Sequence, residues 1–487
     1  MIKTVYGLIE GIEQGTYIEY RGIPFAKPPV GELRWAAPQK PDPFDGVYHA
    51  VSWRNKAVQT EGSAPPWDKD FYDDEAFNPP ASEDCLYLHI WTPNHTDADT
   101  NQTPNAAAPD HTDAIFNESS SIPSPKYPVA IWIHGGAFMH GWGSEKEFDG
   151  AGYAKRGVIL VSIEYRMGVF GFLAHPALTE EAGRSGNYGI LDQIAALDWV
   201  RENIAAFGGD PDNITVFGQS AGAMSTQTLI SSPLTKGKIA KAILQSGGSY
   251  GVGLHGDDTM KDQERYGLVL QEILGKSSIE EMRSVPAMEL LEAQDALIQK
   301  VQEGGSFKLP LAPGIDGYVL PDGYYKLMDQ NEIHDIPYLL GSTKDDIGSN
   351  PKAEDPRDSM LYHGCIRFSQ KLEELGRKPA YVYWFKRNLP GDNQGAWHSS
   401  ELWYTMDTLD RCWRPWEEGD YVLRDQIMTY WTNFMKTGDP NRASSGMAPT
   451  HHADDPSEPA ANLKDKGNLP VWQPCSIENP FVMELDV

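Results

Sequence analysis

The segment from Ile214 to Ser231 (ITVFGQSAGAMSTQTLIS) limits what this chain can fold into more than any other part of the sequence. It predicts a short apolar strand, a sharp turn at Gly218-Gln219-Ser220-Ala221-Gly222, and a helix that ends before Pro233. A serine at such a turn needs strained backbone angles, and its glycine neighbours avoid the collision that a Cβ would cause. The turn lifts the hydroxyl above the sheet, next to a helix N-terminus that favours developing negative charge. This context predicts that Ser220 is a nucleophile; the alternative is a structural glycine turn.

Short apolar runs on both sides of this segment predict the rest of the core. Parallel strands that are buried on both faces are nearly continuous apolar runs, and here such runs are closed by glycine or polar residues. A helical pattern with 3.6-residue spacing covers residues 188–207 and stops at Gly208-Gly209. The alternation predicts the α/β class, with a mostly parallel sheet and helices on both faces. The expected strands are residues 129–134, 158–163, 214–217, 241–247, 336–341 and 380–385.

A second motif, IWIHGGAFMHG, places His134-Gly135-Gly136-Ala137 at the end of one expected strand. A nucleophilic serine needs backbone N–H groups aimed at the oxyanion of the tetrahedral intermediate. Glycines let the chain approach a substrate closely, so Gly135 and Gly136 are predicted donors, together with the N–H of Ala221. We expect His134 to brace this loop rather than to act as a base. The alternative is an ordinary glycine turn after a strand.

The charge balance excludes several classes of partner. The chain has 41 basic and 69 acidic residues, a formal net charge of −28, whereas nucleic acid binding needs clustered Lys and Arg. Anionic membrane surfaces are disfavoured for the same reason. No apolar run approaches the ~20 residues of a membrane-spanning helix, and the start MIKTVYGLIEGIEQG lacks the pattern of a signal peptide. We therefore expect a cytoplasmic protein with no nucleic acid partner and no membrane insertion; a secreted protein after signal removal has the same pattern.

The four cysteines are Cys85, Cys365, Cys412 and Cys475. They are too sparse for a disulfide scaffold and lack the paired spacing of a zinc site. Isolated buried thiols and no structural metal are expected.

Two polar stretches, residues 92–125 and 442–466, interrupt the alternation of strand and helix. They are rich in Asn, Asp, Ser, Thr and Pro and have almost no apolar periodicity. We predict that they are surface-loop insertions in a single domain that spans residues 1–487.

Five segments follow one another in order between residues 21 and 223. They are RGIPFAKPPVGELRW (21–35), EDCLYLHIW (83–91), HGGAF (134–138), EYRMGVFGFL (164–173) and the unbroken stretch 186–223. This series resembles the type-B carboxylesterase family, the branch of the α/β-hydrolases that contains bacterial para-nitrobenzyl esterases and the cholinesterases. The resemblance implies the α/β-hydrolase fold, with extra loops and helices that form a gorge or lid over the active site, and no metal or organic cofactor.

The resemblance also implies a triad of Ser, acid and His in that chain order. The histidine is similar to His398 in GAWHSSELWY, which follows the expected strand 380–385. The acid lies in a segment similar to GSTKDDIG, where the family usually has Glu and this chain has Asp346. Because Asp is one methylene shorter, either the loop lies closer to the histidine or Asp345 serves instead. Asp346 is the prediction; a solvated acidic pair is the alternative.

Two departures from the family pattern bear on the site. The residue before the serine is often Glu in the family and is Gln219 here, which removes a charge without changing the mechanism. In secreted relatives the Cys of the EDCL segment forms a disulfide with an upstream partner, but residues 1–84 contain no other Cys to pair with Cys85. This supports a reducing compartment.

The substrate region is implied only in outline. Residues 64–80 resemble the position of a mobile flap over the family's gorge. Trp67 and Phe71 of this segment, together with Trp397 beside His398, are candidates to line an acyl or alcohol pocket, although core packing is the more frequent fate of such aromatic residues. The expected function is hydrolysis of a small-molecule carboxylic ester through an acyl-serine. The alternatives are a catalytically inactive cholinesterase-like binding protein, or an amidase, thioesterase or lactonase with the same triad. The sequence leaves the natural ester and the oligomeric state open.

Overall fold

The computed structural model describes residues 1–60, 67–94, 126–251, 257–303, 309–350, 352–442 and 469–487. The predicted insertions, residues 92–125 and 442–466, lie almost entirely outside this part of the chain. The predicted start of the first one is wrong by two residues, because a strand runs through Thr92 to Pro93. Thr92 pairs with Ile18 of the neighbouring strand and donates from Oγ1 to the Phe207 carbonyl at 2.8 Å.

The main sheet has ten strands in the described residues, in the order β13-β12-β11-β10-β9-β7-β8-β6-β4-β3. All neighbours from β13 to β8 pair in parallel, and β6, β4 and β3 continue the sheet antiparallel. The parallel strands are β7 Tyr127–Ile133, β8 Ile159–Ile163, β9 Gly209–Gln219, β10 Lys241–Gln245, β11 Tyr338–Thr343, β12 Tyr381–Phe385 and β13 Met483–Leu485. The antiparallel strands are β3 Ile12–Glu13, β4 Tyr17–Pro24 and β6 Tyr87–Pro93, and a small separate sheet contains β1 Ile2–Thr4, β2 Gly7–Glu10 and β5 Val47–His49.

The predicted mostly parallel sheet is therefore confirmed, and the six expected strands match β7 to β12. The antiparallel edge and β13 were not predicted. Polar or charged residues interrupt the apolar residues of β3, β4, β6 and β13, so these strands lack the continuous apolar runs that identify a central strand.

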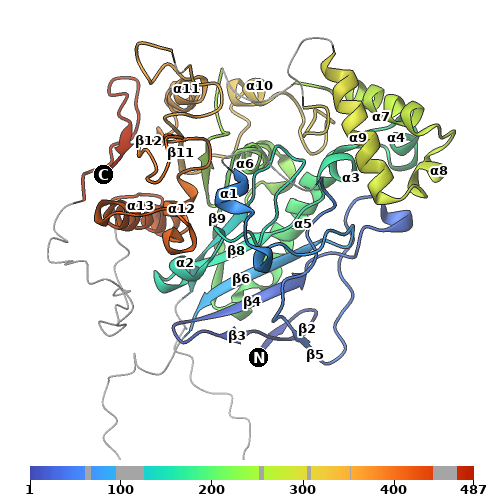
Figure 1. Ribbon diagram of the computed structural model, residues 1–487, viewed down its shortest axis with the longest axis horizontal. Helices are drawn as coiled ribbons and strands as arrows, with labels where there is room; N and C mark the ends of the chain where they lie inside the picture. Colours follow the sequence, from blue (N-terminus) through green and yellow to red (C-terminus); the bar gives the residue numbers. More distant parts are fainter. Residues whose placement is uncertain (61–66, 95–125, 252–256, 304–308, 351, 443–468) are drawn as a thin grey trace, which may run out of the picture.

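Helices cover both faces of the sheet (Figure 1). The predicted helix over 188–207 is α5, Tyr188–Asn203, followed directly by the 3₁₀ helix Ile204–Phe207. Gly208, with a positive φ of 85°, ends this segment. The helix after the serine is α6, Ala221–Ser231. The other helices are α1 Trp67–Phe71, α2 Ala151–Lys155, α3 Gly168–Phe172, α4 Pro176–Ala182, α7 Met260–Leu274, α8 Ile279–Arg283, α9 Ala287–Gln302, α10 Tyr324–Asp329, α11 Met360–Glu374, α12 Leu402–Thr405 and α13 Glu418–Thr437. None of the described helices is long and apolar enough to cross a bilayer.

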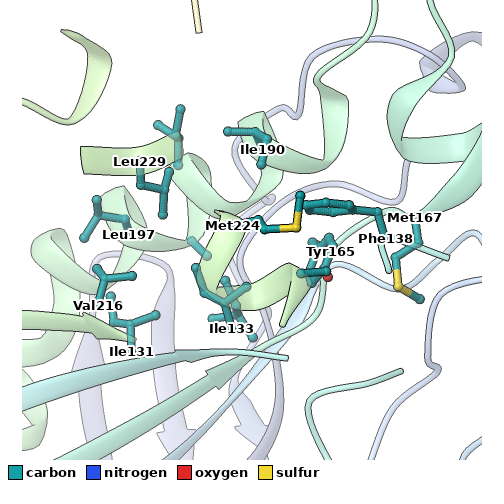
Figure 2. Close-up of a cluster of buried hydrophobic side chains, with 14 of the residues drawn as sticks. Ile131, Ile133, Phe138, Tyr165, Met167, Ile190, Leu197, Val216, Met224 and Leu229 are labelled. Atoms are coloured by element: carbon teal, nitrogen blue, oxygen red, sulfur yellow. The ribbon is translucent and has the colours of Figure 1, made fainter. Parts of the chain in front are cut away.

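Side chains along β7 alternate between two apolar layers, one on each face of the sheet. Ile131 and Ile133 lie in a layer shared with α5 and α6, whereas Ala130 and Trp132 lie in the layer shared with α13. Successive side chains of a strand point to opposite faces, which explains why a continuous apolar run was needed here. Figure 2 shows part of the first layer, with Met224 of α6 among the side chains packed above the strands.

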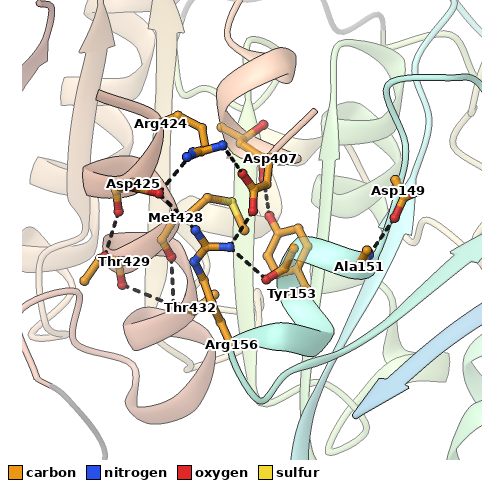
Figure 3. Close-up of polar contacts among 12 residues, drawn as sticks. Asp149, Ala151, Tyr153, Arg156, Asp407, Arg424, Asp425, Met428, Thr429 and Thr432 are labelled. Carbon is orange, nitrogen blue, oxygen red and sulfur yellow. Dashed lines mark hydrogen bonds and ion pairs between the residues drawn. The ribbon is translucent and has the colours of Figure 1, made fainter. Parts of the chain in front are cut away.

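A group of ion pairs fastens α2 to α13 on the second face (Figure 3). Arg156, just after α2, donates to Asp407 at 2.5 Å and to Asp425 of α13 at 3.1 Å. Arg424 of α13 also pairs with Asp407, at 2.8 Å. Because two arginines share one carboxylate, the segment that follows α12 is tied to both helices.

The cysteines have no disulfide partner in the structure. Cys85, Cys365 and Cys475 are buried free thiols, as expected. Cys412 is only partly buried, so the expectation of burial was wrong for this residue. It follows a short 3₁₀ helix, Leu409–Arg411, in the segment before α13.

The double-sided core predicts a large effect from a central β7 substitution. Ile131 is 1% exposed, so Ile131→Ala should lower the free energy of unfolding by about 2–4 kcal/mol through lost burial and a cavity. Val5→Ala, at a position 59% exposed, should change it by less than about 0.5 kcal/mol. Urea unfolding followed by circular dichroism measures both, and equal effects would contradict this account of the core.

Candidate active site

Ser220 occupies a strained turn between β9 and α6. Its φ is 57° and its ψ −125°, outside the regions that a non-glycine residue adopts at low cost. Its N–H donates to the Gln245 carbonyl of β10 at 2.8 Å, and its carbonyl accepts from Met224 of α6 at 3.0 Å. The strand and the helix thus hold the strained residue from both sides.

Close backbone approach explains the glycine two residues after the serine. A Cβ on Gly222 would lie 2.0 Å from the carbonyl oxygen of Ile133, the last residue of β7. Any side chain at this position would therefore push α6 away from the sheet and move Ser220.

The glycine loop after β7 runs beside Ser220. Gly136 has a φ of 98°, and a Cβ there would lie 1.8 Å from the carbonyl oxygen of His140. A Cβ on Gly135 would lie 3.1 Å from the Ser220 Cβ, so this part of the loop touches the serine. Within the described residues the N–H groups of Gly135 and Gly136 donate no hydrogen bond. The N–H of Ala221 opens α6 and so has no partner inside the helix.

His134 lies under the loop, away from the serine. Its Nδ1 donates to the Gly135 carbonyl at 2.9 Å, and its ring stacks on Tyr165 with 4.5 Å between centroids. Burial lowers the pKa of His134 to about 3, so the ring is neutral. These contacts fit a bracing role.

His398 lies between Asp346 and the serine turn. Its Nδ1 donates to Asp346 Oδ1 at 2.5 Å, and its Nε2 is 3.3 Å from the side-chain nitrogen of Gln219, the residue before Ser220. The Asp346 side chain is fully buried. Its oxygens also accept the N–H groups of Thr343 and Ile347, both at 2.8 Å. This arrangement fixes the ring with one nitrogen toward the carboxylate and the other toward the turn.

Asp345 points elsewhere. Its Oδ2 accepts the N–H of Ala396 at 2.8 Å, its own N–H donates to the Ala396 carbonyl at 2.9 Å, and its side chain is 42% exposed. Of the two neighbouring carboxylates, the structure therefore brings Asp346 to His398 and uses Asp345 to tie down the loop that precedes the histidine.

A further carboxylate near the histidine escaped the sequence reasoning. Glu401 is 1% exposed, and its Oε1 accepts from Tyr383 and from Ser246, each at 3.4 Å. Within the described residues its Oε2 has no partner at hydrogen-bonding distance. Burial, with a smaller contribution from the charge of Asp346, raises the pKa of Glu401 from 4.5 to about 7. The sequence feature that could have identified Glu401 was its position three residues after His398, in a segment with few surface residues.

The three aromatic residues expected at the substrate pocket come together. Trp397, next to His398, contacts Trp67 with 5.8 Å and Phe71 with 5.5 Å between ring centroids. Phe71 also contacts Trp403 at 5.2 Å. The side chains of Phe71 and Trp397 are 3% and 5% exposed, so both residues also pack in the core, which was the alternative considered for them. Residues 61–66, the start of the expected flap, lie outside the described residues.

A pocket of about 770 Å³ lies away from this group. Its walls are residues 31–37, the end of α4, the start of α5, α8 and Tyr318. None of the residues predicted for the site lines it.

Comparison with known proteins identifies the family. The model of the carboxylesterase family matches residues 1–357 and 353–487, which together span the whole chain. The chain belongs to the carboxylesterase family. It is a carboxylesterase, an enzyme that hydrolyses carboxylic esters.

Several relatives of this carboxylesterase are known. It is 32% identical to para-nitrobenzyl esterase of Bacillus subtilis (strain 168), over 93% of this chain and 92% of that protein. It is 35% identical to fumonisin B1 esterase of Sphingopyxis macrogoltabida, over 70% of this chain and 55% of that protein. Human neuroligin-2 is 29% identical over 91% of this chain and 61% of that protein.

Solved structures extend the likeness to the fold. A thermophilic para-nitrobenzyl esterase superposes with a TM-score of 0.77 at 29% identity, covering 100% of this chain and 95% of that one. The carboxylesterase EST55 of Geobacillus stearothermophilus gives 0.72 at 28% identity, covering 99% and 96%. The α/β-hydrolase fold expected from the sequence is confirmed.

Glu401 gives this site a stability term that depends on pH. Its pKa is raised on folding, so the folded state binds the proton more tightly, and stability falls as pH rises from about 4.5 to about 7. Glu401→Gln keeps the shape and cannot titrate, so the variant should be more stable than the parent at pH 8 by on the order of 1–3 kcal/mol. Below about pH 4.5 the two should converge. Urea midpoints measured from pH 4 to pH 8 test this, and parallel curves would contradict it.

Proposed function

We propose that this carboxylesterase cleaves small-molecule carboxylic esters through an acyl-serine intermediate. Ser220 is the nucleophile, His398 the general base and acid, and Asp346 the acid that orients the imidazole. The N–H groups of Gly135, Gly136 and Ala221 bind the oxyanion. The observation that carries the proposal is the position of His398, held by Asp346 at 2.5 Å with its other nitrogen at the serine turn.

Acylation follows from these roles. His398 takes the Ser220 proton as the oxygen attacks the ester carbonyl, and the charge that develops on the carbonyl oxygen meets donors that form no other hydrogen bond. Asp346 stabilises the imidazolium that results. When the tetrahedral intermediate collapses, His398 gives its proton to the alcohol, which leaves, and the acyl group remains on Ser220.

Deacylation repeats the same steps with water. His398 removes a proton from a water molecule that attacks the acyl-serine, and the same donors hold the second oxyanion. Collapse releases the carboxylic acid and returns the proton to Ser220. The steps balance with the side chains and water alone.

A catalytically inactive binding protein is the competing class. The presence of Ser220, His398 and the glycine loop supports catalysis. An amidase, thioesterase or lactonase would use the same groups; relatives named as esterases favour the ester. The aromatic residues Trp67, Phe71 and Trp397 are the proposed contacts to the acyl or alcohol group.

The nucleophile is tested by Ser220→Ala. Hydrolysis of a chromogenic short-chain ester should fall by about 10⁶-fold, the scale on which removal of a triad nucleophile acts. Ser231→Ala is a matched control, since Ser231 lies buried in the same helix and its hydroxyl has no hydrogen-bond partner. Substantial turnover by purified Ser220→Ala, free of contaminating esterase, would overturn the proposal.

The acid is tested by a pair of neighbouring substitutions. Asp346→Asn should lower kcat on the order of 10⁴-fold, because the amide no longer orients and stabilises the imidazolium. Asp345→Asn should be nearly silent, since its side-chain oxygen can still accept the N–H of Ala396. Steady-state kinetics of both variants decide the matter; the opposite pattern would transfer the role to Asp345.

A further inference from the structure

Helix α1 is fastened by a buried ion pair to a segment more than 300 residues away. The Asp70 carboxylate accepts from Arg414 Nε at 2.8 Å, from its terminal nitrogen at 3.3 Å, and from Trp413 Nε1 at 2.7 Å. The side chains of Arg414 and Asp70 are 0% and 1% exposed. Arg414 also holds Asp392 on its other side, with two contacts of 2.9 Å.

The position of helix α1 depends on this ion pair. A helix of five residues is too short to be stable alone, so its position depends on tertiary contacts. Both charges are out of water, and a buried charge that loses its partner is strongly unfavourable. The ion pair between Asp70 and Arg414 therefore holds α1 in its observed position.

In this position α1 and the residue after it contact the two loops of the proposed active site, the loop that carries His398 and the loop that follows β7. Trp67 and Phe71 pack on Trp397, the neighbour of His398. Tyr72, just after α1, packs on Trp142 with 5.2 Å between ring centroids. The preceding Gly141 lies against the loop of the oxyanion donors: a Cβ on it would be 3.0 Å from the Gly135 carbonyl oxygen.

We propose that Asp70 and Arg414 are positioning residues for ester hydrolysis. Their buried ion pair seats α1 across the loop of His398 and the loop of Gly135, and thereby fixes the distance between the base and the oxyanion donors. This inference rests on the roles proposed above for those groups. Because the ion pair fixes α1, it also fixes the aromatic side chains of α1 beside the substrate. The ion pair therefore limits the size of the ester that reacts.

Two variants test the ion pair and the aromatic contacts, one each. Asp70→Asn removes the charge partner of Arg414, and Trp67→Ala removes a contact with Trp397 while leaving the ion pair in place. Each should lower kcat for a small para-nitrophenyl acetate substrate by about 10- to 100-fold, the cost of misplacing reacting groups by about 1 Å. KM for this small ester should change little. The preference for the acetate over a bulky para-nitrophenyl benzoate should shrink.

Asp392→Asn is the matched control. It removes a carboxylate from the same arginine, but Asp392 is 26% exposed and interacts with α1 only through the charge of Lys69, so kcat should stay within about 3-fold of the parent. All measurements are made well below the melting temperature of each variant. A lowered melting temperature with unchanged kcat in Asp70→Asn and Trp67→Ala would reduce the ion pair to a structural role and overturn the proposal.

Labelling with a fluorophosphonate separates this inference from the proposed function. The reagent reacts with a serine that is activated by its histidine and oxyanion donors. If the parent enzyme is not labelled at Ser220, the proposed function fails. If it is labelled and Asp70→Asn reacts at the same rate, only the positioning role fails. A rate lowered in Asp70→Asn and normal in Asp392→Asn is the expected result.

Discussion

The strained backbone at Ser220 is the constraint on which the rest of the site depends. A serine with a φ of 57° is held in place because β10 accepts a hydrogen bond from its N–H and α6 donates one to its carbonyl. The helix can approach the sheet this closely because Gly222 presents no side chain to the end of β7. The same end of β7 leads into the glycine loop, so one close contact positions both Ser220, the proposed nucleophile, and the proposed oxyanion donors.

The carboxylates around His398 differ because their surroundings differ. Asp346 accepts two backbone N–H groups and the N–H of the imidazole, so each of its contacts is a hydrogen bond of 2.8 Å or less. Glu401 receives only two long hydroxyl contacts, and burial raises its pKa to about 7. Asp345 is half in solvent and binds a backbone N–H. These three acids thus have three different environments, and only Asp346 hydrogen-bonds to the histidine.

Much of the fold was predictable from local pattern, because a strand buried on both faces needs an uninterrupted apolar run. That rule located β7 to β12, and the spacing of apolar residues located α5. It could not locate β3, β4 or β13, because charged residues interrupt the apolar residues of these strands. The boundary at Thr92 was missed for a related reason: a polar residue at a strand end looks like loop until its tertiary partner at Phe207 is known.

The sequence by itself determined the serine turn and the glycine loop, because both depend on residues adjacent in the chain, where glycine allows what a Cβ forbids. It suggested His398 and an acid at 345 or 346 through a family resemblance. Only the tertiary structure decided which carboxylate lies against the imidazole, that Glu401 is buried beside it, and that Asp70 pairs with Arg414. Those contacts join segments far apart in the chain, and the direction in which a side chain points from a loop is set by what packs around the loop.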